Sequence, residues 1–330
     1  MKKKKYNIAI LGSRGAVGQE MLKILKERKF PYNELKLLST SLEKRKVVGG
    51  HVYERVTEDS FKGMDIGLFS PGASISAIWA PIAAKHGCIV IDNTSQFRMD
   101  PNVPLVVPEV NPEDVKKQKG IIANPNCSTI QMLVALKPLH DYAGIKRIVV
   151  STYQSVSGAG SEAIEELKNQ IKGSKKVNAF RYQILNNLIP QIDVPQDNFY
   201  TKEEMKMVHE TKKIMHDDSI AVTATCVRVP VHRAHSESVN IETKKKITRK
   251  KAIELLKKAP GITVIDDIKN GQYPMPLFAE GKDDTFVGRI REDESIANGL
   301  NLWVVSDNLR KGAALNAIQI AEDLIKYGVI

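Results

Sequence analysis

The sequence lacks the features that mark membrane-spanning and secreted proteins. No apolar run is long enough to cross a bilayer, and the apolar segment 6–11 after the lysine-rich start is too short for a signal peptide. We therefore expect no membrane partner and a cytoplasmic location. Aromatic residues make up 6% of the chain and no nucleic-acid-binding motif is present, so the net charge of +11 favours small anionic ligands over nucleic acid.

Cysteine is also scarce. The chain has three, Cys88, Cys127 and Cys226, at scattered positions, which excludes a disulfide framework. No Cys/His spacing of the zinc type occurs, so we predict no metal site. Cys88 and Cys226 lie inside apolar, strand-like segments and are predicted to be inert core residues.

Cys127 has a different setting. An apolar run ends in Asn124, Pro125 and Asn126, and helical spacing of apolar residues follows Cys127. This pattern predicts a buried strand, a sharp turn, and a helix with Cys127 in its first turn. Unpaired N–H groups and the helix dipole favour a thiolate there, so Cys127 is a candidate nucleophile. The alternative is a small core residue.

Near the N-terminus the order of elements predicts a dinucleotide-binding turn. A buried strand over 6–11 leads into Gly12-Ser13-Arg14-Gly15-Ala16-Val17-Gly18 and then a helical pattern. The spacing is GxxGxxG rather than GxGxxG, but strand, glycine turn and helix suit a pyrophosphate, and Arg14 adds a charge. The alternative is a plain strand-to-helix connection.

The second strand, near 35–38, ends in hydroxyl residues. NAD-binding chains usually have an acidic residue near this point. Here Ser39, Thr40 and Ser41 are followed by Lys44 and Arg45. This favours NADP over NAD, unless the two cations are only solvated loop charges.

A chain of 330 residues with 42% hydrophobic and 26% charged residues predicts a globular protein of two domains. Strands and helices alternate in the first part, which predicts a Rossmann-type, doubly wound parallel sheet. A polar cluster at 92–98 ends in Arg98 where ligands bind such sheets. Long extended segments at 146–156, 220–230, 238–243 and 301–305 predict an α+β second domain with a mixed or mostly antiparallel sheet.

Three further expectations concern that second part. Segment 173–198 has no clear periodicity. Thr201 and Glu204 match a capping box, which leaves Glu203 and Lys206 on nearly one face of a helix. The C-terminal helix, over 309–327, is expected to pack back on the first domain.

Thiol chemistry needs a group that moves protons. His232 and His235 lie in a predicted loop between two strands, and the pattern alone does not choose between them.

Several motifs now combine into one resemblance. They are Asn124-Pro125-Asn126-Cys127-Ser128-Thr129, the stretch Thr152-Tyr153-Gln154-Ser155-Val156-Ser157-Gly158-Ala159-Gly160, and Arg228-Val229-Pro230 leading to His235-Ser236-Glu237. With Asp92-Asn93-Thr94-Ser95-Gln96-Phe97-Arg98-Met99-Asp100, the chain resembles the bacterial form of the aspartate-β-semialdehyde dehydrogenase family, from about residue 7 to residue 323.

The resemblance implies NADPH-dependent conversion of aspartyl 4-phosphate to aspartate 4-semialdehyde and phosphate, reversibly, in lysine, methionine and threonine biosynthesis. It implies a homodimer, possibly a higher oligomer. Residues 1–126 with 308–330 would bind NADP, and 127–307 would form the catalytic and dimerisation domain. The resemblance implies that Cys127 is the thioester nucleophile, His235 the acid/base and Gln154 the orienting residue. Arg228 would bind the substrate carboxylate and Glu203 the substrate amine, and phosphate would be bound by Arg98, Asn126 and Lys206. The implied cofactor contacts are Gly12, Arg14, Gly15, Ala16, Val17, Ser39, Thr40, Ser157, Gly158 and Asn308.

Two departures and two rivals stand beside this reading. Ser13-Arg14 replaces the Ala-Thr common in the family, and segment 173–201 is shorter than in many relatives. N-acetyl-glutamyl-phosphate reductase uses related chemistry but needs no amine-binding carboxylate such as Glu203. A non-catalytic nucleotide-binding module would have no use for Cys127 and His235 together.

Overall fold

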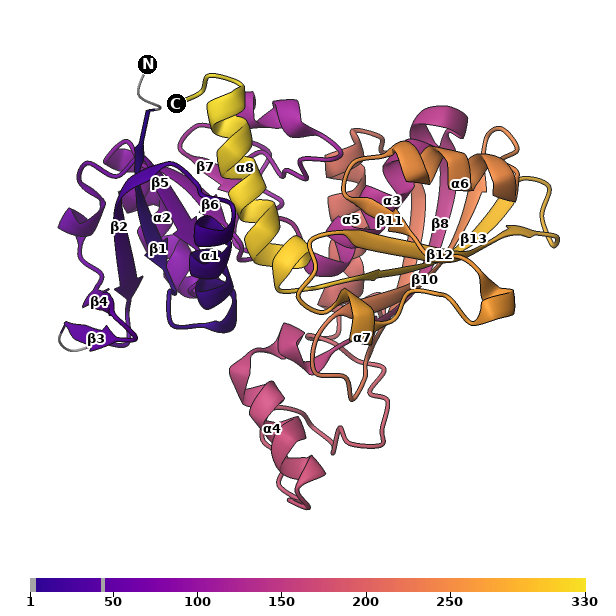
Figure 1. Cartoon of the computed structure of the whole chain (residues 1–330), viewed down its shortest axis with the longest axis horizontal. Coiled ribbons are helices and arrows are strands. Elements are labelled where there is room, and N and C mark those ends of the chain that lie inside the picture. Colours follow the sequence, from indigo (N-terminus) through magenta and orange to yellow (C-terminus); the bar gives the residue numbers. More distant parts are fainter. Residues whose placement is uncertain (1–3, 43–44) are drawn as a thin grey trace. The chain divides into compact units, whose positions relative to one another are not determined.

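In a computed structural model that describes residues 4–42 and 45–330, the chain forms two compact units (Figure 1). Unit 1 comprises Met1–Pro125 with Ala313–Ile330, and unit 2 comprises Asn126–Gly312. Lys44, part of the signal for NADP, and the first residues of the lysine-rich start lie outside the described residues.

Unit 1 is built on one sheet. Its strands are β1 (Tyr6–Leu11), β2 (Tyr32–Ser39), β3 (Lys46–Val48), β4 (His51–Arg55), β5 (Ile66–Phe69), β6 (Ile89–Asp92) and β7 (Ile121–Ala123). Within the described residues they run in the order β3-β4-β2-β1-β5-β6-β7, and only the β3–β4 pair is antiparallel. The helices of this unit are α1 (Ala16–Glu27), α2 (Ala73–Lys85) and α8 (Leu315–Lys326).

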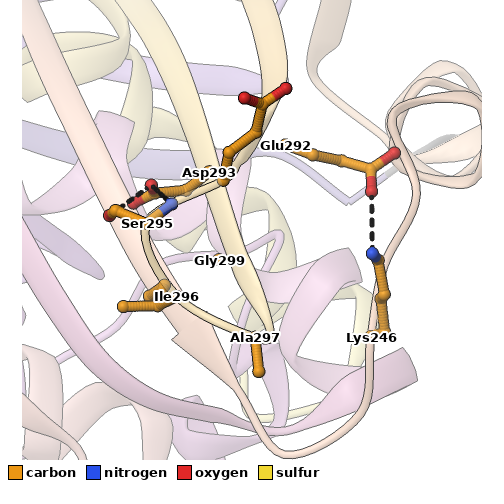
Figure 2. Close-up of a pocket in the computed structure, with 8 residues that line it drawn as sticks. Lys246, Glu292, Asp293, Ser295, Ile296, Ala297 and Gly299 are labelled. Carbon is orange, nitrogen blue, oxygen red and sulfur yellow. Dashed lines mark hydrogen bonds and ion pairs between the residues drawn. The ribbon is translucent and has the colours of Figure 1, made fainter.

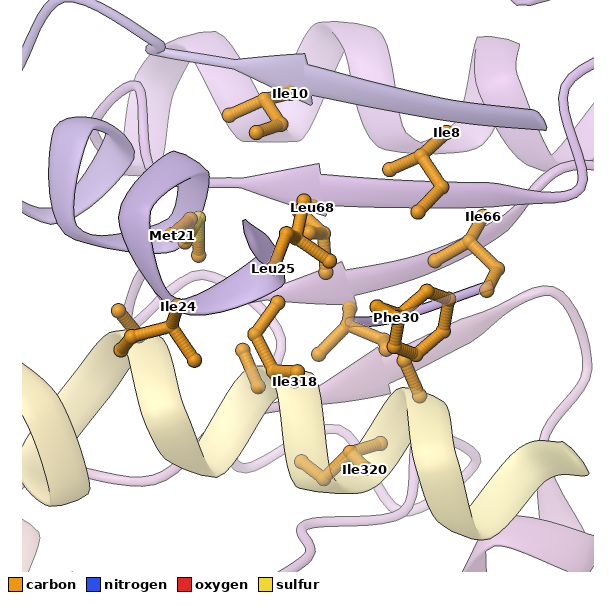
Figure 3. Packing of buried hydrophobic residues seen from close by; sticks show 14 of the residues in the cluster. Ile8, Ile10, Met21, Ile24, Leu25, Phe30, Ile66, Leu68, Ile318 and Ile320 are labelled. Atoms are coloured by element: carbon orange, nitrogen blue, oxygen red, sulfur yellow. The ribbon is translucent and has the colours of Figure 1, made fainter. Parts of the chain in front are cut away.

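The residues of β1 explain why helices cover both faces of this sheet. Side chains alternate along a strand, so Ile8 and Ile10 point to one face and Ala9 and Leu11 to the other. The first pair packs against α1 and α8 (Figure 3). The second pair shares a core with apolar residues of α2. Burying each isoleucine contributes roughly 1.5–3 kcal/mol. The predicted doubly wound parallel sheet is confirmed.

Unit 2 holds a second sheet. Its strands are β8 (Ile145–Gln154), β9 (Ala221–Arg228), β10 (His235–Thr243), β11 (Ile262–Val264), β12 (Thr285–Asp293) and β13 (Gly299–Ser306). The order is β11-β12-β13-β10-β8-β9, with β8–β9 and β11–β12 parallel and the other pairs antiparallel, which confirms a mixed sheet. The helices are α3 (Cys127–Ala143), α4 (Ser161–Ile171), α5 (Lys202–Met215), α6 (Arg249–Lys258) and α7 (Pro276–Ala279).

The two faces of this second sheet differ. Along β10, Glu237, Val239 and Ile241 are buried, whereas Ser238 is exposed and Asn240 is half-buried. Helix α3 packs on β8, β10, β12 and β13, and α5 packs on β9. One face is therefore covered by helices, and the other is largely uncovered within a single chain.

Two local predictions were wrong. His235 does not lie in a loop: it is the first residue of β10, because Ser306 of β13 pairs with it and extends the ladder. The helix predicted from residue 309 begins regularly only at Leu315, after a π-helical turn over Arg310–Ala314. Segment 173–198 is irregular, as expected, and no helix in the described part of the chain is long and apolar enough to span a membrane.

Candidate active site

Cys127 is the first residue of α3 and is partly exposed. The preceding Asn126 is the N-cap, and its side-chain oxygen accepts hydrogen bonds from the N–H groups of Ser128 (3.0 Å) and Thr129 (3.3 Å). The predicted strand, turn and helix are confirmed. Burial raises the pKa of Cys88 to about 12 and also raises that of Cys226, so neither thiol competes with Cys127 as a nucleophile.

Gly312, in the π-helical turn, packs against Cys127. A Cβ atom added to Gly312 would lie 2.8 Å from the Cβ of Cys127, which no real side chain tolerates. Only glycine therefore allows the chain to pass so close to the cysteine. Sequence reasoning missed Gly312, because no local pattern shows which residue a distant glycine will contact.

Glu203, on α5, joins three predicted site residues. One carboxylate oxygen accepts hydrogen bonds from Asn126 Nδ2 (2.9 Å) and Gln154 Nε2 (3.1 Å), and the other accepts from Lys206 Nζ (2.9 Å). Burial alone would raise the pKa of Glu203, but the charge and hydrogen bond of Lys206, with the two amide donors, lower it to about 2. Glu203 is thus a buried carboxylate that stays ionised.

Helix α5 orients this group through the predicted capping box. Thr201 Oγ1 accepts from the Glu204 N–H, and the Glu204 side chain accepts from the Thr201 N–H. Lys206, one turn further on, also forms an ion pair with Asp193 at 2.9 Å. Burial would lower the pKa of Lys206, but the two carboxylates outweigh it and raise the pKa. Asp193, from the irregular segment, was not predicted.

His235 is completely buried and held by Ser155. The backbone N–H of Ser155 donates to Nδ1 at 3.1 Å, and Ser155 Oγ lies 3.0 Å from the same nitrogen. Because Nδ1 accepts, the proton of the neutral ring sits on Nε2. Burial, reinforced by the nearby Arg228 charge, lowers the pKa of His235 to about 3. The ring is therefore a neutral N–H donor.

Asn308 organises the residues around that histidine. Its side-chain oxygen accepts from the hydroxyls of Ser155 (3.2 Å) and Ser157 (3.1 Å) and from the N–H of Ala234 (3.0 Å). Ala234 has φ of 70°, in the left-handed region, directly before His235. This strain is held by the hydrogen bond to Asn308. Ser155 and Ala234 were missed, although Ser155 follows Gln154 at the end of a predicted strand.

Arg228 ends β9 beside Gln154 of β8, and its Nη1 donates to the Ser155 carbonyl at 2.8 Å. Both this guanidinium and the His235 ring pack closely against Gly158: an added Cβ would lie 2.8 Å from Arg228 Nη1 and 3.0 Å from His235 Nε2. Among the described residues His235 Nε2 has no hydrogen-bond partner. Glycine at position 158 therefore allows the guanidinium and the imidazole N–H to lie together.

The glycine turn of unit 1 has the features that a pyrophosphate needs. Gly12 has φ of +84°, and a Cβ there would lie 2.5 Å from the Ser70 carbonyl oxygen. Gly15 is the N-cap of α1 and has no side chain that could cap the first N–H groups of the helix; Ala16 and Val17 follow it. The backbone N–H groups of this helix start suit an anion, so the residues present fit a dinucleotide.

Unit 1 also contains Ser13 and two predicted ligand residues, Arg14 and Arg98. Ser13, the departure from the family pattern, is buried and its hydroxyl donates to the Leu38 carbonyl (2.9 Å), so it braces the turn. Arg14 reaches the end of β2, where Nη1 donates to Ser41 Oγ at 3.3 Å, close to Ser39 and Thr40 in sequence. Arg98 follows β6 and donates from Nη2 to the Asn93 carbonyl at 2.8 Å.

A surface hollow of about 370 Å³ near the β12–β13 turn contains none of the predicted residues (Figure 2). Its polar groups are paired locally: Ser295 donates to Asp293, and Lys246 forms an ion pair with Glu292 at 3.3 Å. These contacts close an ordinary strand connection, so this hollow is not the candidate site.

Comparisons with known proteins agree on one family. Residues 7–118 match the family model described as semialdehyde dehydrogenase, NAD binding domain, and residues 136–311 match semialdehyde dehydrogenase, dimerisation domain. Aspartate-semialdehyde dehydrogenases of Aquifex aeolicus and Bacillus subtilis are 58% and 52% identical to this chain, each covering 98% of it and 99% of the relative.

Solved structures agree as well. Aspartate semialdehyde dehydrogenase II of Vibrio cholerae, complexed with ASA, superposes with a TM-score of 0.93 at 50% identity over 98% of this chain and 99% of that one. The Candida albicans enzyme, solved with NADP, gives a TM-score of 0.77 at 26% identity over 99% of this chain and 100% of that one. With such similarity over nearly its whole length, the chain belongs to the aspartate-semialdehyde dehydrogenase family.

Proposed function

We propose that Cys127 is the nucleophile of this enzyme, an NADP-dependent aspartate-semialdehyde dehydrogenase that interconverts aspartyl 4-phosphate with aspartate 4-semialdehyde and phosphate. One observation carries the assignment. Cys127 is the first residue of α3, and the N-cap residue of that helix, Asn126, donates a hydrogen bond to the Glu203 carboxylate. The same carboxylate accepts a hydrogen bond from Gln154.

The charges of unit 2 suit an α-amino acid. Glu203 remains a carboxylate and would hold the substrate ammonium group, whereas Arg228, a buried guanidinium, would bind the substrate carboxylate. An N-acetylated substrate has no ammonium group and would leave the buried Glu203 without that partner. Glu203 therefore favours the aspartyl substrate over the N-acetyl-glutamyl one.

The thiolate of Cys127 would attack the acyl phosphate carbonyl and form a carbon–sulfur bond. The helix N-terminus and the Arg228 charge favour the thiolate. The Nε2–H of His235 and the positive end of the α3 helix dipole would stabilise the tetrahedral oxyanion. When the oxyanion collapses, the carbon–oxygen bond to phosphate breaks and a Cys127 thioester remains, with Gln154 orienting it.

Phosphate would be held by Arg98, Asn126 and Lys206. Asn126 and Lys206 each donate an N–H to Glu203. Both side chains have more than one N–H group, so phosphate would accept hydrogen bonds from their other N–H groups. NADPH, when bound, supplies the hydride that reduces the thioester. The turn at Gly12, Arg14, Gly15, Ala16 and Val17 would hold its pyrophosphate through backbone N–H groups, whereas the Arg14 side chain, which contacts Ser41, would meet the 2′-phosphate. Ser39, Thr40, Ser157, Gly158 and Asn308 would make the further cofactor contacts.

His235 would then act as a hydrogen-bond donor rather than as a base in the resting enzyme. Its Nε2–H would stabilise the hemithioacetal oxyanion that follows reduction. Collapse of this oxyanion releases the aldehyde and returns Cys127 to the thiolate, so this step needs no net proton. Proton exchange by His235 would be confined to states in which bound charge raises its basicity.

We also propose that unit 1 binds the cofactor and that unit 2 carries catalysis and assembly. The uncovered sheet face of unit 2 would pair with the same face of a second copy in a homodimer. A dimerisation-domain model matches this part of the chain, which supports the assignment. The biosynthetic reaction is in keeping with a cytoplasmic enzyme.

The decisive test combines substrate dependence with one substitution. Wild-type protein should reduce NADP+ with aspartate semialdehyde only when phosphate or arsenate is present. Cys127→Ser should lose at least about a thousandfold in turnover and still bind NADPH, because only the nucleophile is altered. Activity with the N-acetyl-glutamyl substrate alone, or wild-type turnover by the serine variant, would refute the proposal.

A further inference from the structure

Glu237 is a buried carboxyl group for which the mechanism has no role. It lies in the middle of unit 2 with 0% of its surface exposed. Neither carboxyl oxygen makes a hydrogen bond of normal geometry within the described residues. The buried Glu203 is different, since three donors hold that carboxylate ionised. An isolated carboxylate without such donors is very costly to bury, so Glu237 requires an explanation.

The strand register places Glu237 beside the reacting groups. It lies on β10, directly opposite Thr152 of β8 and Val304 of β13. Since side chains alternate, Glu237 shares its sheet face with His235, which precedes it by two residues. On the neighbouring strands, Cys226 and Arg228 lie on that same face, because Cys226 pairs with Thr152 and Arg228 with Gln154.

Helix α3 supplies a side chain within hydrogen-bonding reach of this carboxyl, Gln131. Gln131 is completely buried, one helical turn beyond Cys127, and its Nε2 donates to the His235 carbonyl at 3.4 Å. Its side-chain oxygen has no partner in the part of the chain that the structure describes. An amide oxygen that needs a donor and a carboxyl group that needs an acceptor thus lie together.

Burial determines the protonation state of the carboxyl. It raises the pKa of Glu237 well above the usual value, and the hydrogen-bonding influence of Gln131 opposes it only in part. The neighbouring Cys226 thiol is neutral, as burial raises its pKa too, and the His235 imidazole is neutral. Glu237 is therefore a carboxylic acid with one O–H to donate.

We propose that Glu237, as a neutral acid donating to Gln131 Oε1, forms with Gln131 a bridge between α3 and β10 that positions Cys127 relative to His235. This inference rests on the proposed roles of those two residues. The bridge lies one turn from Cys127 on the helix and two residues from His235 on the strand. Glu237 is thus a positioning residue, not a catalytic one, and it touches neither substrate nor cofactor.

The test compares two substitutions of the full-length enzyme. Glu237→Gln keeps an N–H donor at the same place, so kcat should stay within about threefold of wild type. Glu237→Met keeps the size and removes the donor, and kcat should fall about ten- to a hundredfold, with a smaller change in KM, because misplaced reacting groups slow the chemical step. Gln131→Met should behave like Glu237→Met, and the double variant should add little.

Two readouts do not depend on turnover. The first is the rate at which iodoacetamide alkylates Cys127, which should fall in Glu237→Met and recover in Glu237→Gln.

The second is the free energy of unfolding measured as a function of pH. In the folded protein Glu237 keeps a proton that the unfolded chain releases above its pKa of 4.5, so wild-type stability declines as pH rises above that value. In Glu237→Gln this decline should be smaller, and the variant should gain stability relative to wild type towards alkaline pH.

Glu242→Gln is the matched control, because Glu242 lies on the same strand and pairs with Lys146 at the surface. It should change none of these quantities. Equal loss of kcat in Glu237→Gln and Glu237→Met would overturn the proposal, as would an alkylation rate that neither variant changes. Both results leave the nucleophile assignment intact, since that depends on Cys127→Ser.

Discussion

At the scale of single residues, the site depends on which side chains carry charge. Glu203 and His235 lie in the same unit and are both buried, yet their states are opposite. Donors from Asn126, Gln154 and Lys206 keep Glu203 ionised, whereas burial and the Arg228 charge keep His235 neutral. The contrast separates a group that binds a cation from a group that donates a neutral hydrogen bond.

The state of His235 gives a prediction about pH. A histidine normally titrates near pH 6.5. With a pKa of about 3, the buried His235 ring stays neutral around that pH. The unfolded chain takes up that proton first, so this group's contribution to stability is present above pH 6.5 and is lost progressively as pH falls toward 3. Chemical shifts of the imidazole in labelled enzyme should show no titration between about pH 5 and about pH 8. A midpoint in that range would contradict the neutral state assigned to the buried imidazole.

Arg14 gives a second prediction at this scale. Its guanidinium contacts Ser41 at the end of β2, the region in which such folds distinguish the two nicotinamide cofactors. Arg14→Ala should raise KM for NADP+ about tenfold and change KM for NAD+ much less, if the cation meets the 2′-phosphate. Lys23→Ala, on the exposed side of α1, is the control. Equal effects on both cofactors would instead assign Arg14 to the shared pyrophosphate.

At the scale of elements, the residue that caps α3 also holds a residue of the candidate active site. Asn126 caps the helix with its side-chain oxygen and holds Glu203 with its side-chain nitrogen. Its backbone N–H donates to Glu210 of α5 at 2.7 Å. One residue therefore fixes the first turn that carries Cys127 and also ties it to the helix that carries Glu203 and Lys206.

Substitution of Asn126 should separate these two functions. Asn126→Ala removes the cap and should lower the free energy of unfolding by about 1–2 kcal/mol. Asn126→Ser restores a capping oxygen but no donor to Glu203. Thermal or denaturant unfolding should therefore show recovered stability in the serine variant, while its kcat/KM for the phosphorylated substrate stays low. Recovery of both quantities together would show that Asn126 only caps the helix.

Elements with local signals could be predicted from the sequence, and contacts between distant segments could not. The glycine turn, the strand and turn before Cys127, and the capping box at Thr201 each depend on neighbouring residues, and the structure contains all of them. The start of β10 at His235 depends on pairing with β13, and the π-helical turn lies where Gly312 packs against Cys127. Contacts of this kind between distant segments produce no periodic pattern in the sequence, so they could not be predicted from it.

The same distinction holds for the candidate site. Motif resemblance assigned roles to Cys127, Gln154 and Glu203, and the structure joins Gln154 and Glu203 directly. Ser155, Asp193 and Gln131 had no assigned role, because their importance lies in which distant atom each one meets. The buried acid Glu237 is the clearest case. Its sequence neighbours indicate a strand, but only the fold shows that its carboxyl oxygens have no hydrogen-bond partner among the residues described.

At the scale of the whole molecule, the uncovered sheet face of unit 2 leads to a prediction about assembly. Ser238 is exposed in the centre of that face and pairs with Trp303, which is only partly buried. Ser238→Arg should convert a homodimer of two 36.7 kDa chains into monomers, as seen by sedimentation, because two buried cations would face each other. Glu294→Arg, on the exposed β12–β13 connection, should leave the dimer intact. A dimer that survives Ser238→Arg would place the interface elsewhere.

The division of the chain also sets an order of events during synthesis. Unit 2 is inserted into unit 1, since the chain leaves unit 1 after Pro125 and returns to it at Ala313. The core of unit 1 includes Ile318 and Ile320 of α8, which are synthesised after unit 2. Unit 2 is therefore fully synthesised while the nucleotide-binding unit still lacks its final helix. A truncated chain that ends at residue 312 should show a protease-resistant unit 2 beside a protease-sensitive unit 1, because the unit that carries the cysteine is complete there and the cofactor-binding unit is not.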